Sequence, residues 1–81
     1  MSQAVERTRA VYLHARMELA NAVSALEELE KDESIETVER KRDALQAIIG
    51  CCDVLKATAV AYAAGLGYAK RERREEDYRR R

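Results

Sequence analysis

The sequence predicts an all-α protein, an antiparallel hairpin of two long helices that assembles with further copies into a helical bundle. Apolar residues recur at alternating spacings of three and four along both halves of the chain, which is the helical period. The chain has no proline and three glycines, all at or after Gly50, so it lacks the turn residues of a small β protein. At 81 residues, such a chain is marginally stable without a disulfide, metal or oligomer.

The first helix is expected at about residues 3–31. Its principal apolar stripe has the spacing of a coiled-coil seam and consists of Val5, Thr8, Tyr12, Ala15, Leu19, Ala22, Leu26 and Leu29. We expect Ser2 to cap its start and Glu27 to pair with Lys31 near its end. A second apolar set lies about 200° round the helix and consists of Ala10, Leu13, Met17 and Ala20. This helix therefore needs cover on two opposite faces.

The break between the helices is expected at residues 31–34. Ser34 is a favourable N-cap, and Glu36 would then lie in the first turn of the second helix, where its charge complements the helix dipole. Because this stretch contains no glycine or proline, a single unbroken helix is the main alternative to the hairpin.

The second helix is expected at about residues 35–79, with two neighbouring apolar seams. One seam contains Leu45, Ile48, Cys52, Leu55, Ala59, Tyr62, Leu66 and Ala69. The other contains Ala44, Ala47, Cys51, Val54, Thr58, Ala61, Gly65 and Tyr68. Beyond Lys56 the polar stripe disappears, and residues 57–69 carry no charge. A helix that is apolar on every side is normally buried on every side.

Hairpin geometry predicts that the second helix outruns the first. If the chain folds back about residue 33, Val5 faces Tyr62 or its neighbours, and residues 66–69 receive no cover from their own chain. Since burying one large apolar side chain contributes about 1.5–3 kcal/mol, we expect a homo-oligomer, a dimer or higher. The residues expected at its interface are Leu13, Met17, Ala57, Val60, Ala61, Ala64, Gly65, Leu66 and Tyr68.

Residues 1–81 are expected to form a single helical-hairpin domain, in which residues 70–81 are a charged, Arg-rich helical tail. Residues 27–39 hold seven acids against Lys31, and residues 70–81 hold seven bases against four acids. In the tail, three acid-before-base pairs are spaced for ion pairing and consist of Glu75 with Arg79, Glu76 with Arg80 and Asp77 with Arg81. The expected contacts to a partner or an anion are Lys70, Arg71, Arg73, Arg74 and Tyr78.

The cysteines and the single histidine are expected to be structural. Cys51 and Cys52 are adjacent and point about 100° apart on a helix, which disfavours a disulfide between them and favours a reducing compartment such as the cytoplasm. Cys52 is expected in the core. His14 and Glu18 are one turn apart, but the spacing supplies no third ligand, so neither a metal nor a cofactor is predicted.

The sequence also bears on the class of function. It has no N-terminal signal pattern, and its uncharged run of thirteen residues is shorter than the roughly 20 of a membrane span, so we expect a cytoplasmic protein without a membrane. No glycine-rich phosphate loop, nucleophile elbow or catalytic carboxylate pair is present, so we expect no enzyme. No residue motif identifies a family.

The favoured function is binding by a small, self-associating helical protein that regulates or blocks a macromolecular partner, most simply another protein. An adaptor, a chaperone-like protein and an inhibitor would all fit. Two alternatives stay open: nucleic-acid binding through the Arg-rich tail, and capture of a small anionic or nucleotide ligand between subunits.

Overall fold

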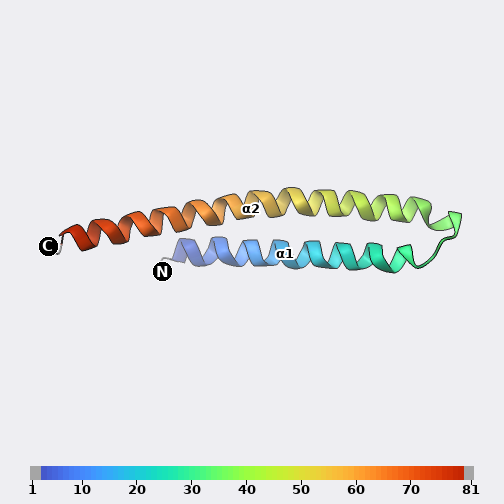
Figure 1. Ribbon diagram of the computed structural model, residues 1–81, viewed down its shortest axis with the longest axis horizontal. Coiled ribbons are helices and arrows are strands. Elements are labelled where there is room, and N and C mark those ends of the chain that lie inside the picture. The colour runs from blue at the N-terminus through green and yellow to red at the C-terminus, as the bar shows by residue number, and fades with distance from the viewer. Residues whose placement is uncertain (1–2, 80–81) are drawn as a thin grey trace.

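The computed structural model describes residues 3–79, which form one antiparallel helical hairpin (Figure 1). Helix α1 spans Gln3–Glu30, a short 3₁₀ helix η1 spans Ile35–Thr37, and helix α2 spans Val38–Arg79. The molecule is 70 Å long and 14 Å in the other two dimensions. The predicted two-helix hairpin is confirmed, and the alternative of one unbroken helix is wrong.

Helix α1 packs on α2 through the predicted seam. Within Gln3–Glu30 the buried and half-buried residues are Val5, Thr8, Tyr12, Ala15, Leu19, Ala22, Leu26 and Leu29, and all other residues of the helix are exposed. This set is identical to the predicted stripe. The alternating spacing of three and four keeps one side of α1 against its neighbour along the whole helix.

Helix α2 presents a stripe that runs between its two predicted seams. Its half-buried residues beyond Lys41 come from both seams and are Ala44, Ile48, Cys51, Leu55, Thr58, Ala59, Tyr62, Gly65 and Ala69. Cys52 is exposed and Cys51 is half-buried, so the prediction of a core position for Cys52 is wrong. The two cysteines lie about 100° apart on the helix, and it is Cys51 that faces α1.

Hydrogen bonds in the connection determine where α2 begins. The Ser34 amide donates to Asp32 Oδ1 (2.9 Å), which holds the pKa of Asp32 below its ordinary value. The buried Thr37 hydroxyl donates to the Ser34 carbonyl (2.8 Å), and Lys41 Nζ donates to the Asp32 carbonyl (2.7 Å). The Ser34 side chain makes no capping hydrogen bond, so Ser34 is not the side-chain cap that the sequence predicts.

One ion pair at the C-terminal end of α1 differs from the predicted one. Lys31 Nζ bonds Glu28 Oε1 at 2.9 Å, so the predicted partner Glu27 is wrong. Both side chains are largely exposed, and such a pair contributes little to stability. The predicted cap Ser2 lies outside the described residues.

The register of the hairpin is about one helical turn from the predicted one. The rings of Tyr12 and Tyr62 lie 5.7 Å apart between centroids. A Cβ placed on Gly65 would lie 3.7 Å from Val5 Cγ2, so Val5 is level with Gly65 and not with Tyr62. The 3₁₀ turn between the helices delays the start of α2 to Val38, which moves every facing pair further along α2. Helix α2 still extends past the N-terminal end of α1 (Figure 1).

This register predicts a measurable coupling between Tyr12 and Tyr62. We expect a double-mutant cycle with Tyr12→Leu and Tyr62→Leu to give about 0.5–1.5 kcal/mol of interaction free energy, because the tilted rings are in contact. Urea unfolding followed by circular dichroism measures it. A matched cycle with Tyr12→Leu and Tyr68→Leu should give none, and a zero coupling between Tyr12 and Tyr62 would contradict the register.

Candidate functional site

The core of the isolated hairpin is very small. Among residues 3–79 the buried residues are Val5 (2% exposed), Ala15 (4%) and Thr37 (7%), and no large side chain is fully buried. The accessible surface is 6891 Å², whereas a compact monomer of this mass exposes about 4,900 Å². One chain therefore leaves uncovered an area that a folded domain of its size would bury.

Much of this exposed surface is apolar. The large apolar side chains that stay exposed are Val11, Leu13, Met17, Val23, Ile35, Val38, Leu45, Ile49, Val54, Val60, Leu66, Tyr68 and Tyr78. Soluble monomers rarely leave so large a share of their apolar side chains in water, and extended apolar surfaces of this kind serve as interaction sites. The exposed apolar residues of this extended hairpin indicate an assembly partner.

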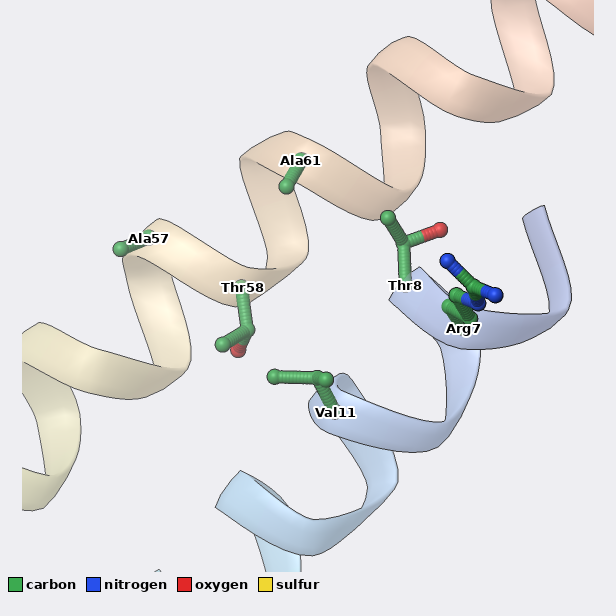
Figure 2. A pocket seen from close by; sticks show the side chains of 6 residues that line it. All are labelled: Arg7, Thr8, Val11, Ala57, Thr58 and Ala61. Carbon is green, nitrogen blue, oxygen red and sulfur yellow. The ribbon is translucent and has the colours of Figure 1, made fainter. Parts of the chain in front are cut away.

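Two adjoining hollows lie along one side of the hairpin, between α1 and α2. Arg7, Thr8, Val11, Ala57, Thr58 and Ala61 line the first, and Figure 2 shows Val11 of α1 and Thr58 of α2 close to each other between the helices. The second shares Val11, and its lining residues include Ala15, Ala47, Gly50, Cys51 and Val54, with His14 and Glu18 at its edge on α1.

We call the continuous apolar part of these two hollows the apolar groove, defined by Val11, Ala47, Gly50, Val54, Ala57 and Ala61. A further hollow, lined by Ala64, Gly67, Tyr68 and Arg71, continues along α2. The α2 residues of the groove and of this hollow keep the heptad spacing, so they form one straight line along the helix.

The predicted interface residues fall into three places. Ala57, Ala61, Ala64 and Tyr68 line the hollows along α2. Leu13, Met17, Val60 and Leu66 are exposed but line none of these hollows. Gly65 is half-buried between the helices, where a Cβ would lie 3.5 Å from Thr8 Oγ1. Gly65 therefore faces α1 within its own chain, and the space between the helices would admit an alanine there.

The predicted interface leaves out four residues of the groove: Val11, Ala47, Gly50 and Val54. The three on α2 were available from the spacing, because they continue the heptad line of Ala57 and Ala61 toward the turn. Val11 precedes the seam residue Tyr12 and so lies at the edge of the α1 stripe, where it is 56% exposed.

Residues with reactive side chains are dispersed. His14 Nε2 lies 3.4 Å from Glu18 Oε1, with both side chains more than half exposed. His14 and Cys51 line the same hollow, while Cys52 is exposed. Among residues 3–79, no group of three or more His, Cys, Asp or Glu side chains is placed to hold a metal ion.

The basic tail is exposed along residues 70–79. The Arg71 guanidinium lies 5.8 Å from the centroid of the Tyr68 ring, a cation–π geometry. The ion pairs of the described chain are those of His14 with Glu18 and of Lys31 with Glu28, so the predicted Glu75 and Arg79 pair is absent. The pairs predicted for Arg80 and Arg81 involve residues outside the described range.

Helix α2 is also long and apolar enough, by length and composition alone, to cross a membrane. Core helices of soluble proteins pass the same test, so this is weak evidence of a span. Asp53 and Lys56 are the only charged residues between Ala44 and Ala69. Charged side chains at the centre of a membrane span are costly, which weighs against one here.

Comparison with known protein families, with curated proteins and with solved structures finds no match to this chain.

Two glycines of α2 test how closely α1 and α2 approach each other. A Cβ on Gly65 would make ordinary contacts with Thr8 and Val5, and a Cβ on Gly67 would meet no atom within 4 Å. We expect Gly65→Ala and Gly67→Ala each to raise the free energy of unfolding by about 1 kcal/mol, because alanine is the better helix former. Chemical denaturation measures both. A loss of stability at Gly65 alone would mean that the helices approach more closely than the structure shows.

Proposed function

We propose that this chain is a non-enzymatic, self-associating helical protein of the cytoplasm that binds and regulates or blocks a macromolecular partner, most simply a protein. The observation that carries the proposal is the combination of a minimal core with an exposed apolar groove of defined shape. Self-association covers apolar surface, and exposed side chains outside the groove remain available to a partner.

Burial energetics support self-association. The exposed surface exceeds that of a compact monomer by about 2,000 Å², and stable homodimers bury comparable areas. At about 25 cal/mol per Å² of apolar area, covering even half of this excess would exceed the net stability of a small domain. Helix–helix packing in a bundle provides such cover without new loops.

The two ends of the hairpin support a binding role beyond assembly. Residues 27–39 around the turn are strongly acidic, and residues 70–79 are an exposed helical extension that carries Lys70, Arg71, Arg73 and Arg74. Tyr78 is 82% exposed at the end of this extension. Tyrosine and arginine are enriched where protein interfaces form, so the tail is the favoured contact region for a protein partner.

Self-association predicts a solution mass of at least twice the 9.2 kDa of one chain. Light scattering on the purified full-length protein, over a range of concentrations, measures this mass. We also expect the melting temperature to rise with protein concentration, because association stabilises the folded state by mass action. A chain that stays at 9.2 kDa throughout and still unfolds cooperatively would overturn the proposal.

Nucleic-acid binding through the tail is a second candidate, and one observation favours it. The tail bases are exposed, and none of those within residues 70–79 is engaged in an ion pair. Tyr68 and Tyr78 are exposed near them and could stack on unpaired bases. Against it, four acids interleave with the bases and reduce the net charge of the tail.

For this candidate we expect affinity for a labelled single-stranded oligonucleotide to fall steeply with salt. Replacing Arg73 and Arg74 by Gln removes two phosphate contacts and should lessen the logarithmic salt slope by about 0.7 for each. Fluorescence anisotropy measures the affinity. The matched control, Arg9→Gln with Arg42→Gln, removes two exposed bases outside the tail and should leave binding unchanged. If the control variant loses as much affinity as the tail variant, the binding depends on the overall charge of the protein and not on the tail.

A further inference from the structure

We infer that the apolar groove is occupied by the same groove of a second copy, docked antiparallel, with the two-fold axis passing beside Ala57. This inference rests on the proposed self-association and adds to it the face, the partner and the direction. A two-fold interface uses one surface of both subunits, so the groove must be complementary to itself.

The α2 residues along the groove and the hollow that continues it meet this requirement in antiparallel order. With Ala57 at the axis, the residues brought level across the interface are Val54 with Ala61, Gly50 with Ala64, and Ala47 with Tyr68. The two large side chains of this line, Val54 and Tyr68, therefore each face an alanine, so no two large side chains meet across the interface. Ala57 also lies near the middle of α2, so this arrangement overlaps the two hairpins along nearly their whole length.

A parallel arrangement on the same groove packs less well. It would place Tyr68 against Tyr68 and Val54 against Val54, and it would leave Gly50 facing Gly50 across an empty space. Facing large pairs hold two helices apart, while facing glycines leave a gap between them, so one helix separation cannot suit both.

The charges at the two ends favour the same direction. Segment 27–39 at the turn end of the hairpin holds seven acids and one base, and the described part of the tail, residues 70–79, holds five bases and four acids at the far end of α2. Antiparallel docking brings the basic end of each copy beside the acidic end of the other. Parallel docking would bring acidic end to acidic end, which electrostatic complementarity disfavours.

The area is also adequate for a second copy. The excess surface of about 2,000 Å², which is spread over the whole hairpin, is larger than the roughly 800 Å² that each partner buries in a standard protein interface. The groove and the α2 face beside it would use only part of this excess. The remaining exposed residues on other faces, such as Leu45 and Ile49, stay free for larger assemblies or for the protein partner.

Disulfide trapping tests the direction. In a background of Cys51→Ser and Cys52→Ser, Ala47→Cys and Tyr68→Cys are made as separate single variants of the full chain, one of them carrying a mass tag. We expect mild oxidation of the mixed variants to give a disulfide between Ala47→Cys and Tyr68→Cys chains, because these positions lie level across the interface. Each variant alone should give several-fold less disulfide-linked dimer. Ala57→Cys, beside the axis, should link to itself.

The outcomes separate this inference from self-association. If each single variant links efficiently to itself and the mixture gives no preference, the dimer is parallel and the inference fails. If light scattering shows a dimer but no pair links, the groove is not the interface and the inference fails, while self-association stands. If every protein is monomeric, the inference and the proposed function fail together.

A charge inserted in the groove gives a second readout. Ala61→Glu would bury a carboxylate against Val54 of the other copy, and we expect the dimer dissociation constant to rise at least tenfold. Val60→Glu is the matched control, because Val60 is 62% exposed and lines none of the hollows. Helical content by circular dichroism shows whether each variant keeps its fold. Equal weakening by both variants would overturn the assignment of this face.

Discussion

A pair of helices can cover only one side of each helix, and this constraint shapes the whole protein. Helix α1 supplies one stripe to α2, and beyond that stripe α2 has apolar residues with no neighbour. The outcome is a molecule 70 Å long in which Val5 and Ala15 are the buried apolar residues of the described chain. A core so small offsets little of the conformational entropy that is lost when long helices become ordered. The exposed apolar area that adds nothing to the stability of a single hairpin is therefore also the area available for binding.

The sequence pattern predicts α1 better than α2, and the reason lies in the composition of each helix. In α1 the stripe from Val5 to Leu29 runs along the whole helix, whereas the second apolar set spans only Ala10 to Ala20, so one face suits a full-length seam. In α2 small or apolar residues occupy three sides after Lys56, and several stripes fit equally well by periodicity. The choice among them depends on the angle at which α1 docks. For this reason Cys51 and Gly65 face α1, while Cys52 does not take the buried position expected of it.

The register depends on hydrogen bonds that no periodicity reveals. Thr37 is buried at the turn because its hydroxyl bonds the carbonyl of Ser34, and the carboxylate of Asp32 holds the Ser34 amide. These bonds form a 3₁₀ turn before α2 and shift the facing pairs by about one helical turn. The overhang therefore begins later along α2 than the fold-back at residue 33 implies, and Ala69 is half-buried. The existence of an exposed extension was predictable, but its starting residue was not.

Apolar burial favours association of these hairpins without choosing a direction, because it depends on area and not on orientation. Direction must come from interactions that differ between the two arrangements. Exposed charge pairs contribute about 0–1 kcal/mol each and are screened within roughly 8 Å at physiological salt. Burying one large apolar side chain contributes about 1.5–3 kcal/mol, so the completeness with which Tyr68 is buried matters more than one exposed charge pair. Size complementarity along α2 therefore contributes more than the charges do, and the charged ends reinforce a direction that packing already favours.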